Sequence, residues 1–256
     1  MSFISLLGIE FKKIRRSKIL WILLTAAVIL WIPSILNAEM NFQMQAEGIS
    51  PEHNFLIQGL LGMSWFMFPA SMVVATVLLN QTEHTNKGLL KMLALPLDTT
   101  RLCLAKFVVL LSLSAAQIFM TVGVYYVSAA IATRTQNYDF LLPPLFVFHK
   151  VGLLFASAIP MLSFFWLLSV CVASPAFSVG IGLFSIVPSV LAINTKLWFA
   201  YPMAYPLFVI TSEYGKLASN METAPVRLFP WIPTAIVLTA SCLLISCLFF
   251  GQGERK

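Results

Sequence analysis

Three histidines, four cysteines and one Gly-Lys pair are the side chains of this chain whose types could support chemistry. His53, His84 and His149 are each expected in a separate loop, and none has a partner at a spacing that binds metal ions. The Gly215-Lys216 pair has Ile210 where a phosphate-binding loop needs its first glycine. The sequence therefore predicts neither a metal site nor a nucleotide-binding loop.

The cysteines and the short catalytic motifs lead to the same expectation. Cys103, Cys171, Cys242 and Cys247 all lie in or beside apolar segments, where cysteine usually acts as a small core residue. Neither a His-Glu-x-x-His zinc motif nor a Gly-x-Ser-x-Gly nucleophile motif occurs in the sequence. We therefore predict that the chain is not an enzyme and that it binds no cofactor of its own.

The composition predicts an all-α integral membrane protein. Of the 256 residues, 59% are hydrophobic and only 10% are charged, whereas soluble proteins carry about 25% charged residues. The alternating pattern of membrane β-barrel strands is absent. The net charge of +6 is attributed to membrane orientation and not to nucleic-acid binding, because no basic run is interleaved with aromatics outside the apolar segments.

Six apolar segments are long enough to cross a bilayer as helices. The predicted spans are residues 19–36, 55–79, 102–132, 147–172, 177–193 and 231–250. In the first span, Trp21 and Trp31 are expected at the membrane interfaces, and in the second, Gly59 offers a small surface for close helix contact. Residues 197–211 are too short to cross and are predicted as a re-entrant segment; a seventh crossing is the alternative.

An amphipathic helix is predicted before the first span, over residues 3–16. One face carries Phe3, Leu7, Phe11 and Ile14, with Ile4 beside them, and Lys12, Arg15 and Arg16 lie opposite. Such a helix lies in the plane of the membrane interface, although a simple basic anchor would give the same charge pattern. We expect this region to be retained and not cleaved as a signal peptide.

Lysine and arginine positions predict the orientation of the chain. With six spans, 11 of these residues fall on the side of both termini and five on the other side. Because basic residues concentrate in cytoplasmic segments, both termini are expected in the cytoplasm. On that side, residues 83–95 are predicted as a short amphipathic helix between the second and third spans. No charged residue lies in the middle of a predicted span, which argues against an ion-coupled carrier.

This arrangement resembles the membrane permease subunits of ATP-binding-cassette type-2 exporters. Their interfacial helix, coupling helix and re-entrant helices correspond in layout to residues 3–16, 83–95 and 197–211. The residues similar to the family motif are Glu83, Gly88, Leu89, Leu90, Pro96, Thr100, Arg101 and Lys106. Two features depart from it: Leu89 stands where threonine is common, and four residues instead of two separate Pro96 from Arg101.

The resemblance implies sites and partners. The ATPase-coupling residues would be Glu83, Lys87, Gly88, Leu89, Leu90, Lys91, Leu93, Pro96, Arg101 and Lys106, and the substrate-side candidates Trp198, Phe199, Tyr201 and Tyr205. The implied partners are a cytoplasmic ATPase that carries ATP and magnesium, a second identical or different permease subunit, and membrane lipids. Asp98 or Thr99 is expected to cap the third span.

The small size, the opening residues 9–18 and the Leu93-Ala94-Leu95-Pro96 run are most similar to permeases of lantibiotic-immunity or bacitracin-type exporters. That resemblance implies a bacterial plasma-membrane exporter of amphipathic peptide antibiotics. Acidic residues on the outer side, Glu39, Glu47 and Glu52, would attract cationic peptides. A lipid or polysaccharide exporter of the same fold, and an ATP-independent channel or carrier, are the alternatives.

Overall fold

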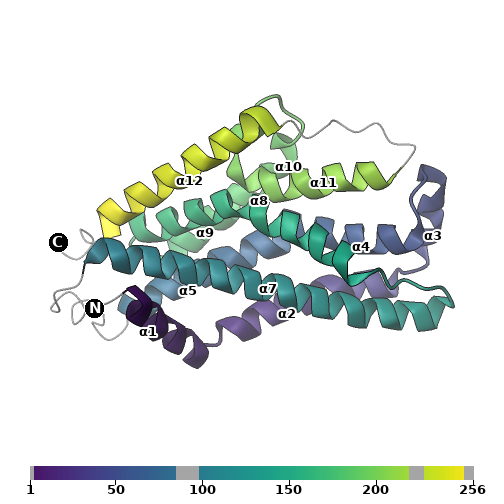
Figure 1. The fold of residues 1–256 in the computed structure, drawn as a ribbon, viewed down its shortest axis with the longest axis horizontal. Coiled ribbons are helices and arrows are strands. Elements are labelled where there is room, and N and C mark those ends of the chain that lie inside the picture. Colours follow the sequence, from purple (N-terminus) through teal and green to yellow (C-terminus); the bar gives the residue numbers. More distant parts are fainter. Residues whose placement is uncertain (1–2, 85–97, 219–227, 251–256) are drawn as a thin grey trace.

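The computed structural model describes residues 3–84, 98–218 and 228–250 and confirms the predicted all-α fold. Among these residues there is no strand, and six helical segments are long and apolar enough to cross a membrane. Figure 1 shows that the helices run along the long axis of an elongated bundle, with the start of α1 and the end of α12 at one end.

The six candidate spans are built from nine helical elements. They cover Ile19–Leu36 (α2), Pro51–Asn80 (α4 Pro51–Gly62, η2 Met63–Met67 and the start of α5 Phe68–His84), Thr99–Gln136 (α7), Pro144–Cys171 (α8), Pro175–Ala192 (containing α9 Pro175–Ile186 and α10 Ser189–Ala192) and Leu228–Phe250 (α12). The shorter elements are α1 Phe3–Arg16, α3 Met40–Gln43, η1 Met44–Glu47, η4 Trp198–Ala200, η5 Pro202–Ala204 and α11 Tyr205–Leu217.

The expectation that the three histidines lie in loops is wrong. His53 and His149 lie near the starts of α4 and α8, and His84 ends α5. Helices α4 and α8 begin earlier than the hydropathy pattern indicates, because each has a proline in its first turn, where no N–H donor is required. Polar residues thereby become part of the helices that carry the adjacent spans.

The longest helix, α7, extends beyond the hydrocarbon layer. Its 38 residues correspond to about 57 Å, whereas the hydrocarbon core is about 30 Å thick. Asp98 caps it as expected, accepting a hydrogen bond from the Thr100 amide at 3.0 Å. Near the other end, the Tyr125 and Tyr126 hydroxyls each donate to a carbonyl of the segment that leads into α8, at 3.1 Å.

A π turn, η2, ends two residues before Pro69 in the second span. Pro69 has no N–H to donate to the Trp65 carbonyl, so the regular hydrogen-bond ladder is interrupted there. Interruptions of this kind are a common cause of helix bends. The α4–α5 span is therefore two helices joined by an irregular turn.

Trp31 forms the centre of the core where α2, α4 and α7 meet. Its side chain is completely buried, with ring centroids 5.6 Å from Phe55 and 5.4 Å from Tyr125. The expectation of an interfacial position is therefore wrong for Trp31, although Trp21 is exposed. Gly59 permits this packing, because a Cβ atom there would lie 2.5 Å from the Trp31 ring.

Replacing Gly59 with alanine is expected to destabilise the protein by about 1–3 kcal/mol, because the added methyl group displaces the buried Trp31 ring. For a chain of this size, the loss corresponds to a fall of several degrees in Tm, measured by thermal unfolding in detergent. Gly123→Ala is the control: a Cβ there meets no atom within 4 Å. Equal unfolding temperatures for Gly59→Ala and the wild type would contradict this account.

Candidate functional site

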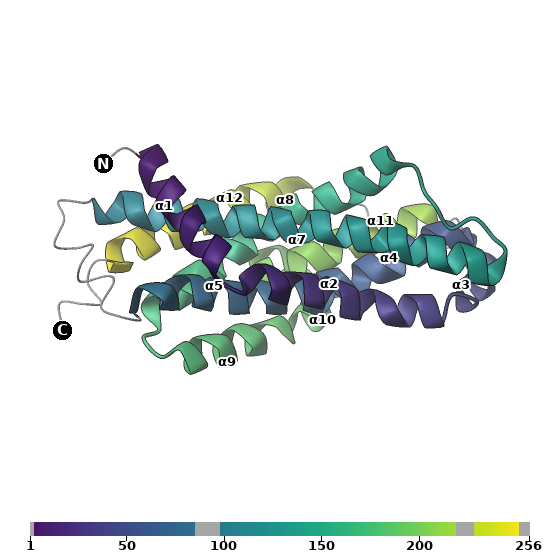
Figure 2. The same cartoon turned by 90° about the horizontal axis from the view of Figure 1, so that it is seen from below.

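A buried ion-pair cluster joins the N-terminal helix to the start of α7. The Glu10 carboxylate is 2% exposed and accepts hydrogen bonds from Lys106 at 2.8 Å and from Lys13 at 2.6 Å. Lys106 itself is 0% exposed. We call Glu10, Lys13 and Lys106 the α1–α7 cluster; Figure 2 shows α1 lying across the bundle, and its contacts with α7 are extensive.

The α1–α7 cluster explains why helix α1 has two different apolar surfaces. Leu6 and Ile14 are buried on the same side as Glu10, against the bundle. Phe3 and Phe11 are exposed, as an interfacial helix requires for contact with lipid. The Glu10 carboxylate, at the edge of the apolar face of α1, thus determines which side of α1 packs against the protein.

The predicted coupling residues are only partly visible in the structure. Glu83 lies in the last turn of α5, but its side chain is outside the described part, and so are Lys87, Gly88, Leu89, Leu90, Lys91, Leu93 and Pro96. Arg101 and Lys106 lie five positions, about one and a half turns, apart near the start of α7. Arg101 forms an exposed ion pair with Asp98 at 3.4 Å, and pairs of this kind contribute little stability.

Sequence reasoning named Glu83 as the acidic residue of the coupling motif and did not identify Glu10 as a partner of Lys106. Glu10 is the carboxylate that Lys106 contacts, although the two residues are 96 positions apart. The available signal was a glutamate at the apolar edge of an amphipathic helix. Lys106 therefore meets α1 in this chain, and a coupling role for it would act through that contact.

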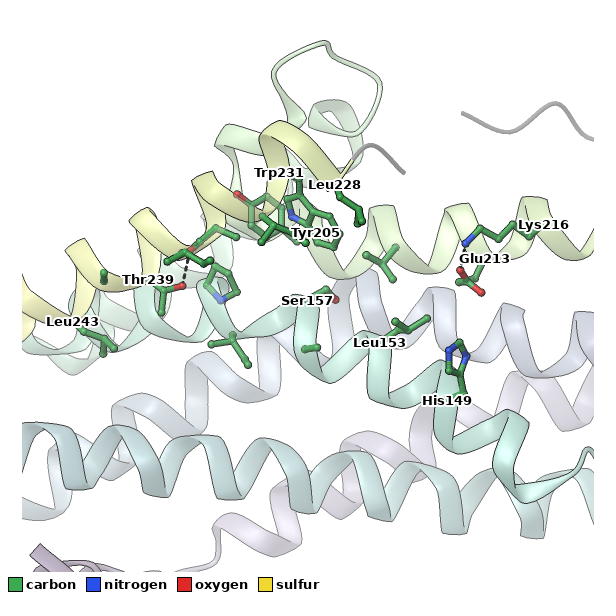
Figure 3. A pocket seen from close by; sticks show the side chains of 18 residues that line it. His149, Leu153, Ser157, Tyr205, Glu213, Lys216, Leu228, Trp231, Thr239 and Leu243 are labelled. Carbon is green, nitrogen blue, oxygen red and sulfur yellow. Dashed lines mark hydrogen bonds and ion pairs between the residues drawn. The ribbon is translucent and has the colours of Figure 1, made fainter. Parts of the chain in front are cut away.

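A pocket of about 880 Å³ lies between α8, α11 and α12. Figure 3 shows that its wall along α12, from Trp231 to Leu243, faces Leu153 and Ser157 of α8. Most of the lining is apolar, but its outermost end is polar, with His149, Glu213 and Lys216. In volume it lies in the upper part of the range typical of small-molecule sites.

A second buried ion-pair cluster forms the polar end of this pocket. Glu213 of α11 is buried and accepts hydrogen bonds from Lys150 of α8 and, at 2.6 Å, from Lys216. Burial raises the pKa of Glu213, but the hydrogen bonds from Lys150 and Lys216 outweigh it and hold the pKa below its usual value. This α8–α11 cluster of Glu213, Lys150 and Lys216 therefore carries one net positive charge at neutral pH.

Two of the four substrate-side candidates gather in an aromatic group beside the pocket. Trp198 stacks on Phe208 with ring centroids 3.7 Å apart and lies 6.1 Å from Tyr205 and 5.7 Å from Trp231. Tyr205 also lines the pocket, and burial raises its pKa to about 12, so its hydroxyl remains a donor.

The other two candidates, Phe199 and Tyr201, lie in or next to η4 and make backbone contacts. The Tyr205 hydroxyl donates to the Phe199 carbonyl, and the Tyr201 hydroxyl donates to the carbonyl of Ser185. These bonds tie η4 and the residue that follows it to α11 and α9. Helix α11 has 13 residues, fewer than the roughly 20 that a crossing needs; its depth in the membrane stays a prediction.

The family comparison assigns the N-terminal three-quarters of the chain. The profile of the ABC-2 family transporter protein matches residues 6–189. The chain belongs to this family. An ABC-2 permease is a membrane component that associates with an ABC ATPase subunit. No curated protein and no solved structure matches the chain.

The residues that match the ABC-2 family model include the α1–α7 cluster but only part of the pocket lining. The matched residues include Glu10, Lys106 and the segment between α5 and α7, whereas α11 and α12 follow the match. Within the described residues, no three His, Cys, Asp or Glu side chains gather in a way that could hold a metal ion. In its described residues, this ABC-2 permease is a helical bundle with two buried ion-pair clusters, the α1–α7 cluster and the α8–α11 cluster.

Proposed function

We propose that this ABC-2 permease exports amphipathic peptide antibiotics, of the lantibiotic or bacitracin type, from the outer leaflet of a bacterial plasma membrane. A separate ATPase would hydrolyse ATP, and both termini would lie in the cytoplasm. The α1–α7 cluster is the observation that carries the mechanism. It holds α1 against the helix that directly follows residues 85–97, so both elements must move together.

In the proposed mechanism, residues 83–95 form the coupling helix. Leu89, Leu90, Met92 and Leu93 dock in an apolar groove of the ATPase, with Lys87 and Lys91 at its rim and Gly88 allowing close approach. Glu83 pairs with a basic group of the ATPase or of the N-terminal helix, and Pro96 ends the helix. Closure of two ATPase copies on ATP then tilts α5 and α7, and the α1–α7 cluster carries α1 with them.

A second permease copy is proposed as the other membrane partner. In the most apolar 18-residue stretch of each span, the share of buried residues differs widely. It is only 22% in α2, 22% in the span that contains α9 and α10, and 6% in α12, whereas it is 50–61% in the other three spans. These surfaces must contact lipid or another subunit, because apolar side chains are not exposed to water. They provide room for a dimer without specifying whether the two copies are identical.

The aromatic group and the outer acidic residues support an amphipathic cationic cargo. Trp198 and Tyr205 belong to the aromatic group beside the pocket. Glu39 is exposed directly before α3, which lies at the end of the bundle opposite the termini (Figure 1). Glu52 is less accessible, because it accepts hydrogen bonds from Ser50 and Tyr138, both at 2.6 Å. A cationic peptide would meet Glu39 first and then the aromatic rings.

We expect cells that carry this permease and its ATPase to resist cationic peptide antibiotics, and the variant Leu90→Asp/Leu93→Asp to lose that resistance. Burying a carboxylate in an apolar docking site costs at least about 2 kcal/mol, which weakens ATPase binding by about 30-fold or more. Growth inhibition and pulldown of the ATPase measure the two effects on the same strains.

Leu145→Asp is the matched control for this experiment. Leu145 is 84% exposed in the first turn of α8, where a carboxylate is favourable, and it lies at the other end of the bundle. It should retain resistance and ATPase binding. Undiminished pulldown by the Leu90→Asp/Leu93→Asp protein would reject the docking scheme, and unchanged sensitivity after deletion of the wild-type chain would reject the peptide cargo.

A further inference from the structure

The pocket between α8, α11 and α12 has the shape and polarity of an amphiphile site. Its apolar part runs inward along α12, where Ile232 and Ile236 are exposed to it and to the surroundings. Its polar part is confined to the outermost end, at His149, Glu213 and Lys216. In a membrane, this order places hydrocarbon at depth and charge toward the surface.

The charge at the polar end favours an anion. Both carboxylate oxygens of Glu213 are already engaged, one by the buried Lys150 and the other by Lys216. Lys216 is more than half exposed, so its ammonium group can accommodate a further ligand. His149 lies across the opening and can donate a hydrogen bond, so the net charge and the available donors both suit a phosphate group.

We propose that this pocket binds one phospholipid of net negative charge, in the leaflet opposite the chain termini. The hydrocarbon chain lies along α12 from Trp231 toward Leu243, and the phosphate contacts Lys216 and His149. A cationic peptide fits less well, since the α8–α11 cluster would repel it. The inference depends on the described geometry and not on the proposed cargo.

Native mass spectrometry of the purified chain, in detergent with equimolar phosphatidylglycerol and phosphatidylcholine, tests the proposal. The wild type should retain phosphatidylglycerol at least about five-fold better, the effect of one favourable lysine near an anionic headgroup. Lys216→Gln should abolish this preference. Ala235→Trp, which fills the apolar part of the pocket, should reduce retention of both lipids.

Lys196→Gln is the matched control, because Lys196 is also cationic and exposed but does not line the pocket. It should behave as the wild type, and unfolding temperatures show whether each variant is folded. Equal retention of the two lipids by the wild type, a preserved preference in Lys216→Gln, a preference lost equally in Lys196→Gln, or undiminished retention by folded Ala235→Trp would overturn the proposal. Because no ATPase or antibiotic is present, such a result leaves the proposed export function untouched.

Discussion

Lys106→Met is expected to destabilise the protein by about 3 kcal/mol and to release α1 from α7. Removing one member of a buried ion pair typically costs about 3–5 kcal/mol, because the remaining charge stays buried without its counter-charge. The lower end applies here, since Lys13 still contacts Glu10 at 2.6 Å. In thermal unfolding, the change corresponds to a fall of roughly 6–10 °C in Tm.

The matched variants separate charge burial from side-chain volume. Glu10→Met/Lys106→Met removes both charges and keeps apolar contacts, so most of the stability should return. Lys12→Met, on the exposed side of α1, should have little effect. If the double variant regains its stability but still exports poorly, the ion pair serves coupling as well as folding; a wild-type Tm for Lys106→Met would show that the pair is not important.

The second large effect is expected from Glu213→Gln, which leaves Lys150 buried without a counter-charge. We expect a loss of about 3–5 kcal/mol at neutral pH and a weaker attachment of α11 to α8. Protection of the α11 amides from hydrogen exchange reports this attachment directly, because local opening exposes them.

The pKa of Glu213 also predicts that the stability of the folded protein falls at acid pH. Its pKa in the folded protein lies below 4.5, since Lys150 and Lys216 stabilise the carboxylate more than burial destabilises it. The stabilisation is therefore complete above about pH 4.5 and is lost as the pH falls through the lower folded-state pKa. His149 lines the same pocket but lies on the other side of the opening.

The difference in unfolding temperature between the wild type and Glu213→Gln should shrink progressively as the pH is lowered from 7 to below 4.5. Glu39→Gln, an exposed carboxylate at the same end of the bundle, should stay parallel to the wild type. A constant difference between the wild type and Glu213→Gln across the range would show that the carboxylate charge contributes nothing specific.

The spans were predictable because hydropathy alone identifies a helix that must satisfy its own hydrogen bonds in lipid. The Asp98 cap and the close packing at Gly59 were predictable for similar local reasons. The position of Trp31 was not, because its burial depends on Phe55 and Tyr125 from two other helices.

The two ion-pair clusters could not be predicted because their members are distant in sequence. Lys150 and Glu213 are 63 positions apart, and counting charges by side of the membrane treats Lys150 only as an orientation signal. The coupling segment is different: its sequence motif was visible, but residues 85–97 lie outside the described part of the chain.

The unbroken length of α7 has a mechanical consequence. A stiff rod of about 57 Å that pivots by 10° at one end moves its other end through an arc of about 10 Å. Lys106 lies near the N-terminal end of α7. Toward its C-terminal end, Tyr125 and Tyr126 form hydrogen bonds with the segment that leads into α8. A small displacement at the end near Lys106 would therefore produce a much larger displacement at the opposite end of α7.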